Sequence, residues 1–128
     1  MDEKLLERAE EFHGHMCGGL TIGLRTGLLA QKLFSEISFR NAEIIVTSKT
    51  SACPKDGLMV VLGVRPDNRT LEINPDLDCD YKFYDIIDEK TVKVFMKELP
   101  EGVTREQSAK FYREAEDEAI FRWEIIEE

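Results

Sequence analysis

The sequence predicts an α+β fold: a single sheet, antiparallel or mixed, packed by two N-terminal helices and a long C-terminal helix. Apolar residues recur at helical spacing before residue 34 and after residue 104, whereas short β-branched or alternating segments fill the middle of the chain. With 128 residues, 42% of them hydrophobic, the chain can bury a core without disulfides or a structural metal. Because no linker or repeat divides it, we expect residues 1–128 to form one domain.

Two helices open the predicted fold. The first covers residues 2–12 and ends near His13, because Gly14 interrupts its pattern. The second covers residues 19–34. Three of its glycines share one face: Gly19, Gly23 and Gly27. Each costs about 1 kcal/mol relative to alanine, so we expect close packing against another backbone, with a groove that faces a ligand as the alternative.

The middle of the chain predicts four strands and one short helix. The strands are expected over residues 42–47, 70–73, 76–83 and 90–97. The short helix is expected over residues 55–62, because Pro54 suits a first helical turn and Gly63 ends the apolar run.

A long final helix is predicted to begin at Thr104. The spacing of Thr104 and Gln107 is typical of a capping box. Its expected buried stripe consists of Ala109, Tyr112, Ala115, Ala119, Trp123 and Ile126.

Charge and cysteine content exclude several classes of protein. The net charge of −9, with 26 acidic against 17 basic residues, argues against a nucleic-acid partner. No apolar run approaches the roughly 20 residues that span a membrane, and the acidic N-terminal segment is unlike a cationic leader. Three irregularly spaced cysteines are unlike a secreted disulfide framework, so we expect a reducing cytoplasm.

Both histidines of the chain lie beside a cysteine, in His13-Gly14-His15-Met16-Cys17. Imidazole and thiolate are the ligands that zinc and related metals prefer. The three side chains can converge only if Gly14 breaks the helix, since His15 would otherwise point away. Cys17 also precedes the second helix, whose free amides favour a thiolate. Three interpretations stay open: a metal site, thiol chemistry, and a structural role with Cys17 buried and the histidines ending the first helix.

Cys53 is the second candidate, in the loop between a predicted strand and the short helix. Lys49 and Lys55 flank it and would favour its thiolate. Asp56 has three candidate roles: metal ligand, partner that orients an imidazole, or carboxylate stabilising the first helical turn, the last being favoured. Cys79 lies on the apolar side of an alternating segment and is expected in the core.

A family resemblance emerges from these motifs. The segment Phe12-His13-Gly14-His15-Met16-Cys17-Gly18-Gly19-Leu20, followed by Gly23 and Arg25, resembles the Phe-His-Gly-His-x-Cys-Pro-Gly-x-x-x-Gly-x-Arg signature of the FmdE-like family, whose name comes from formylmethanofuran dehydrogenase. Ala52-Cys53-Pro54-Lys55-Asp56-Gly57 is similar to its second cysteine segment. Gly18 stands where the family usually has proline, and Ser51 where an acidic residue often stands. The chain resembles the N-terminal domain of longer members, without their four-cysteine zinc ribbon.

The resemblance implies a transition metal, zinc or another divalent ion, bound by His15, Cys17 and Cys53, with His13 as fourth ligand or as a group that supports a ligand. It also implies an accessory role beside a molybdenum or tungsten oxidoreductase, such as the enzyme of methanogenesis that names the family, but assigns no stand-alone reaction.

Three other hypotheses stay open. One is a small metal-dependent enzyme with Asp56 or Glu11 as general base. Another is a thiol redox protein that uses Cys17 and Cys53 as a pair. The third is an assembly module, for which we expect a homodimer with two-fold symmetry.

Overall fold

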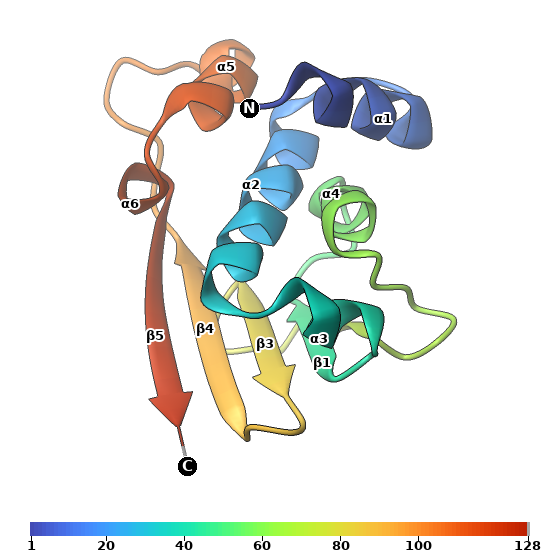
Figure 1. The fold of residues 1–128 in the computed structure, drawn as a ribbon. Coiled ribbons are helices and arrows are strands. Elements are labelled where there is room, and N and C mark those ends of the chain that lie inside the picture. The colour runs from blue at the N-terminus through green and yellow to red at the C-terminus, as the bar shows by residue number, and fades with distance from the viewer. Residues whose placement is uncertain (128) are drawn as a thin grey trace.

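The computed structural model describes residues 1–127 and shows an α+β fold built on one mixed five-stranded sheet (Figure 1). The strand order is β2-β1-β3-β4-β5. Strands β1 and β2 run parallel, and every other neighbouring pair is antiparallel. The strands are β1 (Ile44–Ser48), β2 (Leu71–Ile73), β3 (Tyr81–Asp85), β4 (Lys90–Met96) and β5 (Phe121–Glu127).

Two helices that pack side by side, α2 and α4, dominate the helical layer (Figure 1). Helix α1 packs against α4 at its outer side, and α5 packs against α2. The helices are α1 (Glu3–His13), α2 (Gly18–Leu33), α3 (Glu36–Arg40), α4 (Pro54–Leu62), α5 (Ser108–Glu114) and α6 (Asp117–Ile120), with a 3-10 turn, η1 (Arg105–Gln107).

The main core lies between this helical layer and the sheet. Alternate residues of β3, Tyr81 and Phe83, are buried, as are Val92 and Val94 of β4. They meet Leu58 and other apolar residues of α2 and α4 in one cluster. Burial of this apolar surface holds the helices on the sheet and thereby fixes the positions of the helix ends that carry the candidate site residues.

Six predicted elements are confirmed, and their observed ends differ from the predicted ones by two residues at most. They are the first two helices, the short helix and the strands over residues 42–47, 70–73 and 90–97. The strand predicted over residues 76–83 is partly wrong, because β3 begins only at Tyr81. Asn74 accepts hydrogen bonds from the amides of Asp76 and Leu77, which makes a turn there instead. Helix α3 was not expected from the sequence.

The prediction of a long C-terminal helix is wrong. The capping box of Thr104 and Gln107 is present, but helix α5 ends at Glu114 and the chain finishes in strand β5. Glu114 and Glu118 would stand four residues apart on a continuous helix and repel each other. The alternation in Phe121-Arg122-Trp123-Glu124-Ile125 instead suits pairing with β4.

Within residues 1–127, no helix is both long enough and apolar enough to span a membrane.

Candidate metal centre

A break between α1 and α2 brings the first three candidate residues together. Gly14 ends α1 in the left-handed conformation, with φ of 103°, and its amide donates to the carbonyl of Glu10. The chain then turns, and Cys17 becomes the N-cap of α2. The helix break that convergence of these side chains requires is therefore confirmed, and ligand atoms of His13, His15 and Cys17 lie close together across it.

Close contact between α2 and α4 brings Cys53 to the same place. A Cβ atom at Gly23 would lie 2.1 Å from the carbonyl oxygen of Pro54, and one at Gly19 would lie 2.9 Å from the Cβ of Cys53. The expected close packing of the glycine face is thus confirmed. Because Cys53 immediately precedes α4, this contact sets the thiol beside the N-terminus of α2.

Four side chains from the two motifs form one group. One ligand atom each from His13, His15, Cys17 and Cys53 lies within 4.8 Å of every other. His15 is exposed and the other three are half-buried. In a tetrahedral zinc site, bonds of about 2.0–2.3 Å place neighbouring ligand atoms roughly 3.3–3.8 Å apart, so small side-chain movements suffice to close this group on an ion. The donor set fits a divalent transition metal.

Asp56 contacts the ring nitrogen of His13 that does not face Cys17. Its Oδ2 lies 2.6 Å from Nδ1 of His13, and the two side chains are only 25% and 12% exposed. When Nδ1–H donates to this carboxylate, Nε2 keeps its lone pair, and that atom lies 3.9 Å from Sγ of Cys17. Metal-binding histidines commonly have such a carboxylate partner. Asp56 does lie in the first turn of α4, as the helix-stabilising role favoured from the sequence requires. That role alone does not account for its contact with the imidazole of His13.

The two thiols of the group have different surroundings. The amide of Leu20 donates to Sγ of Cys17 at 3.4 Å. Partial burial, and then the neighbouring Cys17 thiol, raise the pKa of Cys53. The pKa of Cys53 is thus raised, not lowered as expected from the flanking Lys49 and Lys55. A cation bound at the group would favour both thiolates.

Cys79 lies apart from this group, as predicted. Its side chain is buried at 3% exposure, and Sγ donates to the carbonyl of Tyr81. Burial, followed by the nearby charge of Asp78, raises the pKa of this thiol. Cys79 is therefore a core residue.

A protein-family comparison covers both motifs. The model described as "FmdE, Molybdenum formylmethanofuran dehydrogenase operon" matches residues 12–127. The chain belongs to the FmdE family. The match spans all four members of the His/Cys group and Asp56. No curated protein matches the chain.

This FmdE-family chain also has a cleft beside the group, with a volume of about 540 Å³. Cys17 and Cys53 are among its lining residues, and Arg105 and Ser108 come from η1 and the start of α5. This part of the site was not predicted from the sequence. The capping box locates a turn at Thr104, but nothing local in the sequence indicates that the turn packs over the N-terminus of α2.

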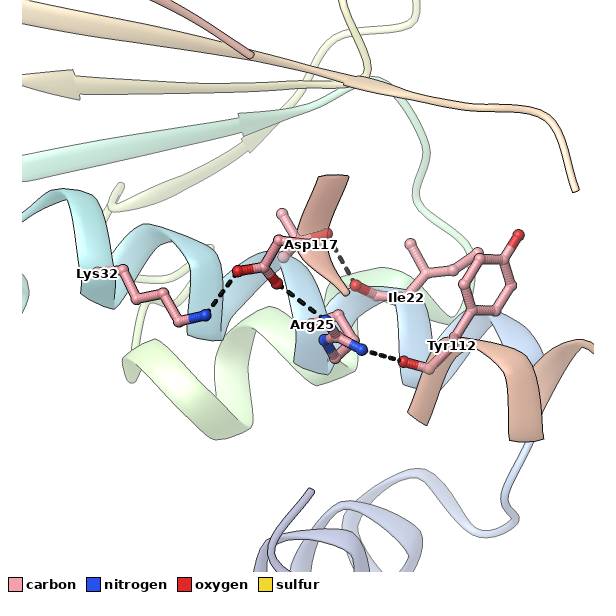
Figure 2. Close-up of polar contacts among 6 residues, drawn as sticks. Ile22, Arg25, Lys32, Tyr112 and Asp117 are labelled. Atoms are coloured by element: carbon pink, nitrogen blue, oxygen red, sulfur yellow. Dashed lines mark hydrogen bonds and ion pairs between the residues drawn. The ribbon is translucent and has the colours of Figure 1, made fainter. Parts of the chain in front are cut away.

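An ion-pair network holds the α5 side of the cleft in place (Figure 2). Arg25 of α2 donates to the carbonyl of Tyr112 at 2.6 Å and to Oδ1 of Asp117 at 2.9 Å. Lys32 donates to the other carboxylate oxygen at 2.6 Å. Burial opposes the charge on Asp117, but these hydrogen bonds outweigh it and hold the pKa of the carboxyl below its ordinary value. Arg25 is thus a structural residue that fixes a wall of the cleft.

Proposed function

We propose that this FmdE-family chain is a metal-binding protein in which His13, His15, Cys17 and Cys53 hold one divalent transition metal, with zinc as the ion that best suits the donors. The grouping of the four ligand atoms within 4.8 Å carries this proposal. Two imidazoles and two thiolates form a common tetrahedral zinc set.

His13 has support as a direct ligand. Its contact with Asp56 fixes the ring so that Nε2 faces the Cys17 thiol. His15 is the exposed member, so its imidazole is the ligand that exchanges most readily with water or another donor. The proposed site therefore joins three sheltered ligands with one exposed ligand.

The biological setting follows from the family and is also a proposal. The family description refers to a molybdenum formylmethanofuran dehydrogenase operon. This supports an accessory role beside a molybdenum or tungsten oxidoreductase. We further propose a homodimer in a reducing cytoplasm, where both thiols stay available for the metal. Light scattering that finds a monomer at micromolar concentration would contradict the dimer.

Elemental analysis of untagged protein tests the metal site. We expect about one zinc per chain in the natural protein. Cys17→Ser and Cys53→Ser should each lose most of it, because each removes a thiolate. Cys79→Ala is the matched control: it removes a thiol outside the group and should retain the metal. A natural chain without metal, or full metal content in both site variants, would overturn the proposal.

Cobalt reconstitution tests the ligand set independently. Cobalt bound by two thiolates gives strong sulfur-to-metal charge-transfer absorption, and each serine variant should lose about half of it. His13→Ala should shift the visible bands while that absorption persists. Unchanged visible bands in His13→Ala would remove His13 from the ligand set.

A further inference from the structure

The cleft beside the His/Cys group differs in charge from the rest of this acidic protein. Two other surface hollows are lined by glutamates of α1, among them Glu7 and Glu10. No carboxylate lines the cleft within residues 1–127, and Arg105 is the one basic side chain that lines it. One further hollow also has no acidic lining, but its arginine, Arg65, pairs with Asp67. In a chain of net charge −9, a hollow that combines the absence of acidic lining with an arginine outside any described ion pair favours an anionic ligand.

Arg105 is available to such a ligand. It is exposed, and no ion pair among the described residues involves it, whereas Arg25, Arg40, Arg65 and Arg122 each pair with a carboxylate. Its backbone carbonyl accepts from the buried Ser108 hydroxyl, which anchors the turn from which the guanidinium extends. The adjacent first turn of α2 contains no acidic residue, so nothing there repels an anion.

The rest of the lining is mainly apolar. Ile22, Pro54, Leu99 and Tyr112 contribute to it, and Tyr112 is fixed by its carbonyl contact with Arg25. A volume of about 540 Å³ lies within the range of small-molecule sites. An apolar surface with one cation at its edge suits a molecule that has an apolar body and one charged end.

We propose that this cleft binds a small organic carboxylate: its carboxylate pairs with Arg105, its apolar chain lies on Ile22, Leu99 and Tyr112, and its far end points toward the metal held by Cys17 and Cys53. Binding of the carboxylate rests on the cleft alone. Only the orientation of the far end rests on the proposed metal site. The cleft is then the place where a substrate or effector of the metal centre is recognised.

Hexanoate and hexanol are matched probes, because they share a chain and differ in charge. Fragments of this size bind with dissociation constants on the order of millimolar. We expect hexanoate to shift the backbone amide NMR signals of Gly18, Gly19 and Ser108 saturably in both metal-free and zinc-loaded protein. Hexanol should bind at least fivefold more weakly, since it cannot pair with Arg105. Equal affinities for the two probes, or shifts confined to other parts of the chain, would overturn the proposal.

Arg105→Gln tests the proposed pairing. It should weaken hexanoate binding by about fivefold to tenfold and leave hexanol unchanged. Arg113→Gln is the matched control, because it removes the same charge from a residue that lines one of the acidic hollows. Equal weakening by both variants would show a general charge effect and contradict a site at Arg105.

Competition with inorganic phosphate tests whether the cleft prefers an organic carboxylate to a simple anion. If phosphate displaces hexanoate at equal concentration, the apolar chain contributes nothing to binding and the assignment to organic carboxylates fails.

Cobalt-loaded protein tests the orientation. Paramagnetic broadening falls steeply with distance, so the terminal methyl signal of hexanoate should broaden more than the methylene next to its carboxylate. The reverse pattern would overturn the orientation. A chain that binds no cobalt but still shows the Arg105-dependent amide shifts would refute the metal site and the orientation while the carboxylate site stands.

Discussion

Nδ1 of His13 lies 2.6 Å from Oδ2 of Asp56, and this contact joins the last residue of α1 to the first turn of α4 across 43 residues of sequence. It orients the one imidazole of the group that is both sheltered and held by a second side chain. The same contact links the two motifs that supply Cys17 and Cys53. The proposed metal site therefore depends on the packing of three helix ends.

Replacing this carboxylate should weaken metal binding more than it weakens the fold. Asp56→Asn keeps the size of the side chain but removes the charge that supports a metal-bound imidazole. We expect zinc affinity to fall about 10- to 100-fold, measured by competition with a chromogenic chelator. Asp76→Asn, in an exposed turn, should leave affinity unchanged. Equal affinities in Asp56→Asn and the natural chain would mean that His13 binds no metal.

The contact between α2 and α4 should control both stability and metal affinity. In Gly23→Ala the new methyl would lie 2.1 Å from the Pro54 carbonyl oxygen, so the two helices must separate. We expect a loss of about 3 kcal/mol in the free energy of unfolding, measured with urea, together with weaker zinc binding because Cys53 moves from Cys17.

Gly63→Ala is the control for Gly23→Ala, because it changes backbone conformational preference without a steric clash. Its Cβ would meet no atom within 4 Å, but its φ of +73° disfavours alanine. It should lose only about 1 kcal/mol and keep its zinc affinity. Loss of zinc affinity in Gly63→Ala but not in Gly23→Ala would contradict the role assigned to the α2–α4 contact.

Much of the site could be predicted because its signals are local. Gly14 as a helix end, Cys17 ahead of α2 and Cys53 ahead of α4 each follow from a few neighbouring residues. A contact of Asp56 with an imidazole could be raised only as one alternative, and without naming His13, since nothing local indicates which distant side chain Asp56 meets. The position of Arg105 over the N-terminus of α2 depends wholly on tertiary packing.

The C-terminal segment shows where periodicity fails. Ala115, Ala119 and Trp123 are spaced as on a helix, yet Phe121 and Trp123 equally fit one face of a strand. The choice depends on β4, which offers Val94 and Met96 as partners to this segment. The run of acidic residues between positions 114 and 118 was the local signal for the break, because like charges four residues apart disfavour a helix.

Hydrogen exchange should distinguish strand β5 from the helix predicted there. Strand β5 is an edge strand, so successive amides point alternately toward β4 and toward solvent. We expect alternating protection by NMR from Phe121 to Glu127, and continuous protection through the interior of α2 as the internal control. Uninterrupted protection from Ser108 to Glu127 would instead indicate the long helix.

The Asp117 carboxylate should make stability depend on acid pH. It accepts from both Arg25 and Lys32, and its side chain is only 11% exposed. In Asp117→Asn the amide cannot pair with two cations, so we expect a loss of about 2 kcal/mol at neutral pH, measured by urea unfolding. Asp78→Asn removes a carboxylate that pairs with Lys93 at the surface, and should have a much smaller effect.

The pH dependence follows from the lowered pKa of Asp117 in the folded protein. Its contribution is fully present above the unfolded-state pKa near 4 and is lost as pH falls through the lower folded-state value. The natural chain should therefore exceed Asp117→Asn in stability at neutral pH, and the difference should shrink below about pH 4. A difference that stays constant down to pH 2 would show that the variant acts through packing rather than through charge. Because Arg25 also holds Tyr112, loss of this ion pair should loosen the α5 wall and weaken hexanoate binding in the same variant.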